Sequence, residues 1–130
     1  MYKRFLILST SVLAGIILAA CSSSNSDAPA HTVEEYLNTL VAKDADRLPT
    51  LVCGEWEDDA LIELDSFQAV EARLEAMACQ QTGTDGETAL VDCTGSIIAT
   101  YNDEDQELDL SVRIYQVVQE DGDWLVCGTR

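Results

Sequence analysis

The sequence predicts an α+β domain in which N-terminal helices pack on one face of a curved antiparallel sheet. Apolar residues recur at helical spacing over residues 32–67, whereas β-branched residues and alternation dominate from about residue 75 onwards. Acidic or glycine-containing turns separate the segments of the second half. Because the helices precede the strands along the chain, we expect an antiparallel meander that is covered by helices.

The first helix is expected to begin at Thr32. Residues 32–35, Thr-Val-Glu-Glu, fit a capping box, in which the Thr32 hydroxyl accepts a hydrogen bond from the Glu35 backbone N–H. Apolar residues then recur on one helical face as far as Val41, and the helix should end near Lys43.

Two further helical segments are expected before the sheet. Asp44 is a candidate N-cap for a short helix that carries Leu48 and Leu51, and Pro49 suits an early position in it. The next helical stretch extends towards Leu74. Its apolar face consists of Trp56, Ala60, Leu64 and Phe67.

Strands are expected in the second half of the chain. Residues 90–101 are rich in β-branched side chains, and Gly95 among them is a predicted β-bulge. Apolar and polar side chains alternate over residues 108–114, which is the pattern of a half-buried strand. Residues 124–127 form the last predicted strand, after another acidic hairpin turn.

Residues 1–20 have the three parts of a secretory signal. Lys3 and Arg4 give a positive start, an apolar run follows, and small residues end the segment at Ala20. The apolar run covers at most residues 5–20, which is shorter than the roughly 20 residues that span a membrane.

The Leu-Ala-Ala that precedes Cys21 resembles the lipobox of bacterial lipoproteins. The resemblance implies that the Cys21 thiol receives a diacylglycerol, whose two chains anchor firmly, and that a dedicated peptidase cuts before it. The alternative is an ordinary cleaved signal followed by a chance cysteine. Residues 21–31 are small and polar and predict a flexible tether, and residues 32–130 predict a single domain.

An acylated Cys21 would place the protein in the cell envelope, anchored in the membrane on the extracytoplasmic side. Ser22 follows the cysteine where aspartate would signal retention. By resemblance to known sorting rules, this implies the outer membrane in a bacterium with two membranes. In a bacterium with one membrane, the domain would face outward from the plasma membrane.

The charge balance narrows the classes of partner. The chain has 24 Asp and Glu residues against 7 Lys and Arg, and its formal net charge is −17. Such a chain is repelled by nucleic acid and by anionic lipid headgroups, so nucleic acid is not expected among its partners. A cationic partner or metal ions would be attracted, although solubility alone also explains an acidic surface.

Four cysteines follow Cys21, and an even number in an exported domain predicts two disulfides. Cys79 and Cys93 lie symmetrically about an Asp-Gly hairpin turn, so antiparallel strands would bring them opposite each other. That pairing leaves Cys53 with Cys127, which would tie the helical half of the chain to the last strand.

Three short phrases resemble the nuclear transport factor 2-like superfamily. They are Val-Glu-Glu-Tyr-Leu at residues 33–37, Ala-Lys-Asp-Ala-Asp at residues 42–46 and Glu-Asp-Gly-Asp-Trp-Leu-Val-Cys at residues 120–127. They look most like small bacterial lipoproteins of unknown function, over about residues 32–130. The resemblance implies a cone, with helices wrapped on a strongly bent sheet and a pocket between them. The superfamily contains ketosteroid isomerases, dehydratases and non-enzymatic domains, so the fold does not settle the function.

An isomerase-type site needs a carboxylate base and hydrogen-bond donors inside an apolar cone. Asp92 is the candidate base because it stands in an otherwise apolar strand segment, with Tyr101 and Tyr115 as donors. These positions do not match the motif of the superfamily's enzymes. The alternative places Asp92 on the solvent face of the sheet and packs the tyrosines against the sheet.

No metal or cofactor is expected. Asp103, Asp105 and Glu107 alternate as in a calcium loop, but Leu108 stands where an EF-hand has glycine and the distal glutamate is absent, so a solvated turn is predicted. Zinc is the alternative interpretation of the four cysteines. No CxxC pair occurs, however, and the one histidine, His31, lies in the expected tether.

We therefore expect a lipid-anchored, non-catalytic domain that binds an envelope protein or a small ligand. One alternative is a small-molecule isomerase or dehydratase with a pocket in the cone. The other is a structural envelope protein that forms a homodimer through its sheet. A pocket between helices and sheet, and the side chains that line it, would separate these hypotheses.

Overall fold

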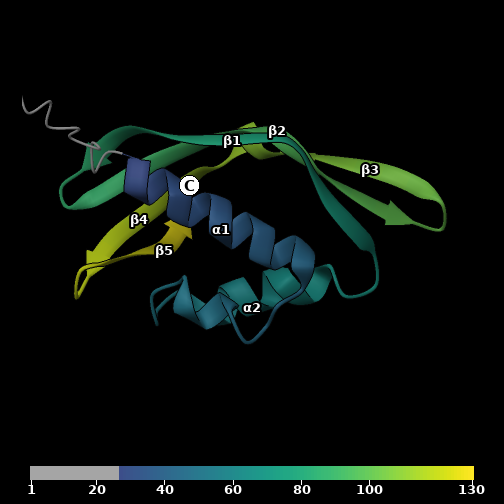
Figure 1. The fold of residues 1–130 in the computed structure, drawn as a ribbon, viewed down its shortest axis with the longest axis horizontal. Coiled ribbons are helices and arrows are strands. Elements are labelled where there is room, and N and C mark those ends of the chain that lie inside the picture. The colour runs from purple at the N-terminus through teal and green to yellow at the C-terminus, as the bar shows by residue number, and fades with distance from the viewer. Residues whose placement is uncertain (1–26) are drawn as a thin grey trace, which may run out of the picture.

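Two α-helices near the N-terminus pack against a five-stranded antiparallel sheet (Figure 1). The arrangement comes from a computed structural model, which describes residues 27–130. The predicted α+β class is therefore confirmed. The predicted signal segment, residues 1–20, and Cys21 lie outside the described residues. Within the described part, no helix is long and apolar enough to cross a membrane.

Helix α1 (Ala28–Ala42) begins inside the segment that was expected to be a tether. Pro29 stands in its first turn, where a residue without an N–H is favoured. Thr32 lies within the helix and does not cap it, and its hydroxyl donates to the Ala28 carbonyl oxygen at 3.1 Å. The folded domain thus starts earlier than expected. The helix ends as predicted, at Lys43 in the left-handed conformation (φ 58°). Its fully buried residues include Val33, Tyr36, Leu37 and Leu40.

Helix α2 (Glu57–Ser66) follows a short 3-10 helix, η2 (Leu48–Thr50). The expected helical extension towards Leu74 is wrong, because that residue lies in strand β1 (Glu71–Asp85). The first residues of β1 alternate between exposed and half-buried side chains, which is a strand period. Pairing with the next strand satisfies their backbone groups, and this non-local contact decides the local structure.

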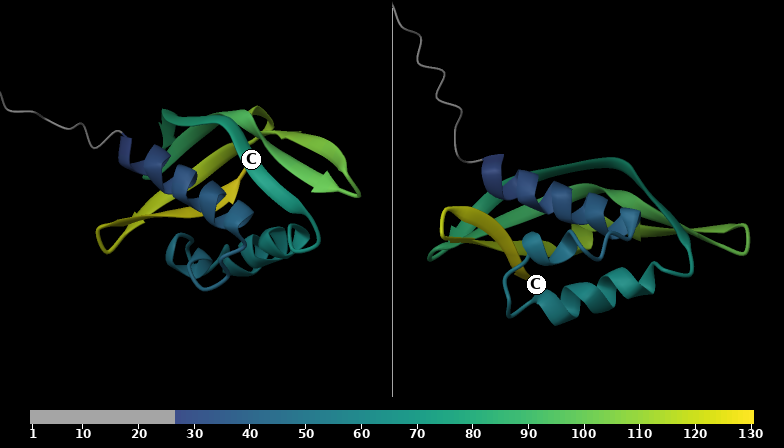
Figure 2. Two further views of the ribbon diagram at one scale, coloured as in Figure 1. Left: turned by 45° about the vertical axis from the view of Figure 1, so that its right-hand side comes forward. Right: turned by 60° about the horizontal axis from the view of Figure 1, so that its bottom comes forward.

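The sheet is completed by β2 (Thr88–Tyr101), β3 (Glu104–Asp109), β4 (Ile114–Glu120) and β5 (Asp123–Thr129). The long strand β2 is central and pairs with β1 along most of its length. On its other edge, β2 pairs first with β4 and then with β3, and β5 pairs with β4. All these pairings are antiparallel, and the β2–β3 hairpin extends beyond the helices (Figure 2).

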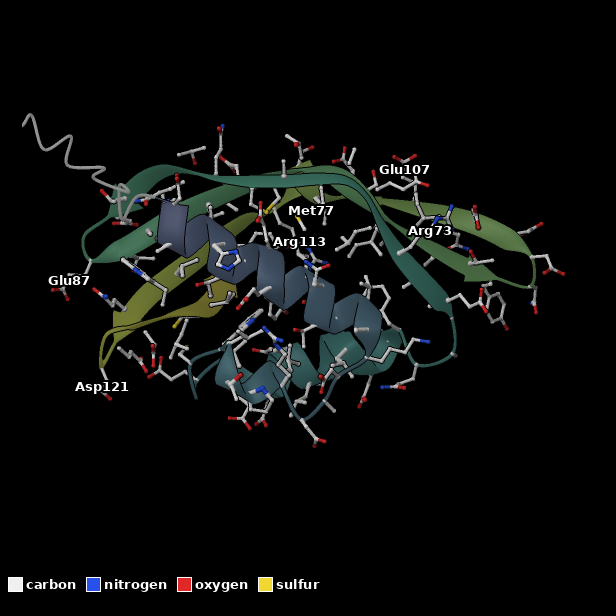
Figure 3. All side chains as sticks on the ribbon, viewed as in Figure 1. Arg73, Met77, Glu87, Glu107, Arg113 and Asp121 are labelled. Atoms are coloured by element: carbon white, nitrogen blue, oxygen red, sulfur yellow. A yellow bond between two sulfur atoms is a disulfide. The ribbon has the colours of Figure 1, made fainter. Side chains whose placement is uncertain are left out.

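The sheet bends where β1 passes Gly95 of β2. The register steps from Glu75 to Ala78 in β1, so that Ala76 and Met77 both lie opposite Gly95. Gly95 has φ 88°, and a Cβ atom there would lie 2.5 Å from the Ala76 carbonyl oxygen. The bulge predicted at Gly95 therefore belongs to β1, and the glycine leaves room for it. Met77 marks this bend in Figure 3.

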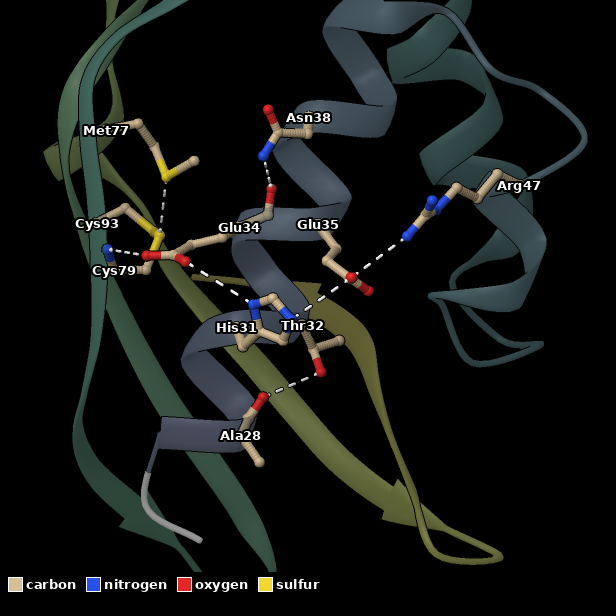
Figure 4. A network of polar contacts seen from close by, with 10 residues as sticks. All are labelled: Ala28, His31, Thr32, Glu34, Glu35, Asn38, Arg47, Met77, Cys79 and Cys93. Carbon is tan, nitrogen blue, oxygen red and sulfur yellow. Dashed lines mark hydrogen bonds and ion pairs between the residues drawn. A yellow bond between two sulfur atoms is a disulfide. The ribbon is translucent and has the colours of Figure 1, made fainter. Parts of the chain in front are cut away.

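A disulfide joins Cys79 of β1 to Cys93 of β2, as predicted. The two residues are register partners with Cα atoms 4.1 Å apart, and the bond is 2.03 Å long. Gly86 (φ 61°) lies in the turn between the two strands. The Cys79 N–H donates to Glu34 Oε1 of α1 at 3.1 Å, which fixes the helix against β1 (Figure 4).

The second predicted pair, Cys53 and Cys127, consists of two neighbouring free thiols in the structure. Val52 and Val126 form a parallel bridge, and the Cys53 N–H donates to the Val126 oxygen at 3.0 Å. Burial, together with the contact with Cys53, raises the pKa of Cys127 to about 12. Cys127 is therefore a protonated thiol at neutral pH.

Candidate functional site

An apolar pocket lies between the end of α2 and the sheet, and its volume is about 110 Å³. Its apolar lining comes from three elements, β2, β3 and the 3-10 helix η3, and from the residue that follows α2. These residues are Phe67, Ile97, Leu108, Leu110 and Val112. The polar groups at the pocket belong to Glu63, Asp109, Arg113 and Tyr115. Such a pocket, apolar with a few polar groups, is typical of a ligand site.

The 3-10 helix η3 (Leu110–Val112) shapes one wall of the pocket. Asp109 caps η3, because its carboxylate accepts from the Ser111 N–H at 2.8 Å and from the Ser111 hydroxyl at 2.7 Å. These two hydrogen bonds lower the pKa of Asp109. The turn buries Leu110 and leaves Val112 73% exposed beside the pocket.

Glu63 of α2 connects both helices to the sheet at the polar side of the pocket. Its Oε2 accepts from the Tyr36 hydroxyl at 2.6 Å, and its Oε1 accepts from Arg113 Nη1. Desolvation would lower the pKa of Arg113, but Glu63 more than offsets it, so the net shift is upwards. The Glu63–Arg113 ion pair therefore holds its charges beside an apolar pocket.

Two buried tyrosines lie next to this ion pair. The rings of Tyr36 and Tyr115 pack edge to face with centroids 6.2 Å apart. Burial, and then the charge of Glu63, raises the pKa of Tyr115 to about 12 and that of Tyr36 further. Both phenols keep their protons at neutral pH, so they are donors and not bases.

Three exposed apolar side chains line the pocket and the neighbouring hollow that meet at the Glu63–Arg113 pair, and we call them the apolar rim. They are Ile62, Leu108 and Val112, which are 69%, 44% and 73% exposed. Ile62 lines a shallow hollow that shares Glu63 and Arg113 with the pocket. Leu108 and Val112 line the pocket itself, and large apolar side chains exposed at a pocket are a feature of interaction surfaces.

The predicted catalytic candidate Asp92 does not lie at this pocket. Its neighbours in β2, Val91 and Cys93, are buried in the core, so the alternation of the strand turns Asp92 to the other face. There it accepts a hydrogen bond from the Thr82 hydroxyl at 2.6 Å. Tyr115 is the register partner of Val91 and faces the core. The structure therefore does not bring the expected base and donor together.

Tyr101, the other predicted donor, is also remote from the pocket. It ends β2 at the tip of the β2–β3 hairpin and is 54% exposed. Two acidic residues of this hairpin bind separate partners. Asp105 accepts a hydrogen bond from Arg73 at 3.1 Å, and Glu107 accepts one from the Ser96 hydroxyl at 2.6 Å. Over residues 27–130, no three His, Cys, Asp or Glu side chains are grouped to hold a metal ion.

His31, which was expected in the tether, lies on the exposed side of α1 (Figure 4). Its Nε2 is 3.5 Å from Glu35 Oε1, and the same oxygen is 3.3 Å from Arg47 Nη2. His31 Nδ1 lies 4.0 Å from Glu34. The Glu35–Arg47 contact links α1 to the segment after it.

The sequence did not single out Glu63 or Arg113 as site residues. The sequence offered one indication that Arg113 is a site residue, because it is the one basic residue in the alternating segment 108–114 of an acidic chain. Glu63 offered no such indication, because α2 has many acidic residues and Arg113, the partner of Glu63, stands 50 positions away in the sequence.

The comparisons with known proteins do not assign a family. No protein-family model matches the sequence, and no curated protein matches it. Among solved structures, the chain is similar to a SEC-C motif containing protein from Rhodopseudomonas palustris, with a TM-score of 0.48 and 12% sequence identity. The match covers 85% of this chain and 94% of that one.

Proposed function

We propose that the protein is a non-catalytic binding domain of the bacterial cell envelope, and that the pocket beside α2 holds an apolar group of an envelope protein or a small ligand. The observation that carries this proposal is the apolar pocket beside the exposed apolar rim of Ile62, Leu108 and Val112. The neighbouring polar groups support a non-catalytic role, because Glu63 is hydrogen-bonded to Tyr36 and ion-paired with Arg113.

The size of the pocket limits what enters it. An engineered apolar cavity of about 150 Å³ holds one benzene molecule. A pocket of about 110 Å³ therefore suits one branched aliphatic or small aromatic group and not a steroid. The isomerase alternative also loses its candidate base, since Asp92 faces away from the core, and no observation favours a homodimer through the sheet.

The proposed location rests on two independent supports. The residues before Cys21 resemble a lipobox, which implies an anchor in the membrane, and Ser22 implies the outer membrane where there are two. The Cys79–Cys93 disulfide suits an oxidising, extracytoplasmic compartment. Membership in the nuclear transport factor 2-like superfamily is part of this proposal and rests on the sequence phrases alone.

The anchor is tested by the intact mass of the protein purified from membranes. We expect a mature chain that begins at Cys21 and carries acyl groups, and we expect C21S to lose them and to leave the membrane fraction. A Cys21 without acyl groups would contradict the anchor while leaving the pocket proposal untouched.

The pocket is tested by titrating the protein with toluene and following its methyl resonances by NMR. We expect saturable shifts at Ile97, Leu110 and Val112 but not at Val126, which is buried elsewhere in the core. F67W, which fills the pocket, should abolish these shifts, whereas a variant with the same new side chain at an exposed site, Y101W, should keep them. Shifts spread over all methyl groups, or none, would contradict the proposal.

A further inference from the structure

We propose that the natural occupant of the pocket is a basic amphipathic segment of a protein partner, which places one apolar side chain in the pocket and Lys or Arg side chains beside it. This inference rests on the proposed function and names the class of its partner. It is argued from two observations. The apolar pocket has room for about one side chain, and acidic residues lie near the apolar rim.

The acidic residues flank the apolar rim on both sides. On α2, Asp58, Asp59 and Asp65 are exposed and stand three or four positions from Ile62, which is the spacing of neighbours on one helical face. On the opposite side, exposed Asp109 lines the pocket itself. A segment that fills the pocket beside Asp109 and continues across the exposed face of α2 therefore meets carboxylates at both ends.

Arg113 is the one basic side chain among the residues that line the pocket, and it does not change this balance. Its guanidinium is paired with Glu63, so the two charges cancel locally. The field at the rim is thus negative, as is that of the whole chain with its net charge of −17. Electrostatic attraction steers a cationic segment to such a surface and raises its association rate.

Other occupants fit these charges less well. A second copy of the chain carries the same negative charge and is repelled, and so are anionic lipids and nucleic acid. A neutral small molecule would use the pocket but not the exposed apolar rim or its carboxylates. An amphipathic peptide uses all three features, because its apolar face meets the rim while its charges meet the acidic residues.

The test measures binding of a fluorescent amphipathic peptide of leucine and lysine to the full chain, by anisotropy at low and high salt. The apolar contribution is examined with the double variant I62S/V112S, and Y101S is its matched control because Tyr101 is an exposed apolar residue at a distant hairpin. We expect the double variant to weaken binding about tenfold or more and the control to change it less than about twofold.

The charge contribution is examined with D58N/D59N/D65N. Its control, E87Q/D103N/D121N, removes the same number of charges at hairpin turns, two of which are labelled in Figure 3. We expect the first triple variant to weaken binding at low salt about tenfold and the control to weaken it much less. Circular dichroism should show that all four variants are folded.

Three results would overturn the inference. These are equal losses in the two triple variants, binding unaffected by I62S/V112S, or equal binding of a leucine and serine peptide without charge. If toluene still enters the pocket in such a case, the proposed function stands and only the class of partner is wrong. If toluene also fails to enter, both are wrong.

Discussion

The Tyr36 hydroxyl of α1 donates a 2.6 Å hydrogen bond to Glu63 Oε2 of α2, across 27 positions of the sequence. The other oxygen of the same carboxylate accepts from Arg113, just before β4. Both helices and the sheet thus meet at one side chain, at the polar side of the pocket. Because Tyr36 is fully buried, this contact supports the fold as well as the site.

Replacing Tyr36 by phenylalanine should lower the free energy of unfolding by about 1–3 kcal/mol, because the hydrogen bond to a charged group is lost. Urea denaturation measures the change. The control Y101F removes an exposed hydroxyl and should change the free energy by less than about 0.5 kcal/mol. Equal stability of Y36F and the unmodified protein would show that the bond contributes nothing.

Tyr115 predicts a loss of stability at alkaline pH. Burial raises its pKa from the ordinary 10.0 to about 12, so the unfolded chain releases this proton at a lower pH than the folded one. The contribution of Tyr115 to the free energy of unfolding is fully present below about pH 10. It is lost as the pH rises towards 12, at about 1.4 kcal/mol per pH unit. Denaturation at several pH values should show a flatter decline for Y115F than for Y101F. Parallel declines would contradict this assignment.

Replacing Gly95 by alanine should destabilise the protein by at least about 2 kcal/mol. The new Cβ would lie 2.5 Å from the Glu75 and Ala76 oxygens, at a positive φ that L-residues rarely adopt. Gly54, where a Cβ meets no atom within 4 Å, provides the control, and G54A should stay within about 0.5 kcal/mol. Thermal melting of both variants measures the difference, and similar melting temperatures would show that the bend tolerates a side chain.

Removing the Cys79–Cys93 disulfide with C79A/C93A should lower the free energy of unfolding by about 3 kcal/mol. The two residues are 14 positions apart, and a closed loop of this length restricts the unfolded chain by about that amount. Denaturation of the variant beside the oxidised protein measures it. If reduction of the unmodified protein produced no comparable loss, the stabilisation would have another origin.

Cys53 and Cys127 should form a second disulfide in protein taken from an oxidising envelope. They are neighbours across the Val52–Val126 bridge, and the high pKa of Cys127 makes the reaction slow without a catalyst of disulfide exchange. Alkylation of the unfolded, unreduced protein followed by mass measurement should then find neither of these cysteines modified. C53S should gain one modified cysteine, and two modified cysteines in the unmodified protein would contradict the second bridge.

Patterns that depend on local period or turn chemistry predicted the fold well. The apolar stripe of α1, the last strand and the Asp-Gly turn that aligns Cys79 with Cys93 are where the sequence placed them. The errors arose where contacts distant in sequence decide. Leu74 continues a helical pattern but pairs with Ile97 of β2, and the bulge opposite Gly95 depends on the register of β1.

The site was much harder to predict. Asp92 was predicted as a candidate base because it interrupts an apolar segment, but the two-residue period of β2 places its side chain on the face away from the core. The Glu63–Arg113 pair depends on how α2 crosses the sheet, and no spacing in the sequence encodes that crossing. Exposure of Val112 likewise depends on η3, which interrupts the alternation expected over residues 108–114.

The hydrogen bond from the Cys79 N–H to Glu34 has a consequence for association between copies of the chain. β1 is an outermost strand, and its outward N–H groups are what a foreign strand needs in order to continue the sheet. Glu34 already occupies one of them, and the bulge at Ala76 interrupts the row. At β5, another outer strand, the bridge to Val52 occupies part of the edge in the same way. The sheet is therefore closed to edge-to-edge aggregation at these points, even where many copies are crowded together.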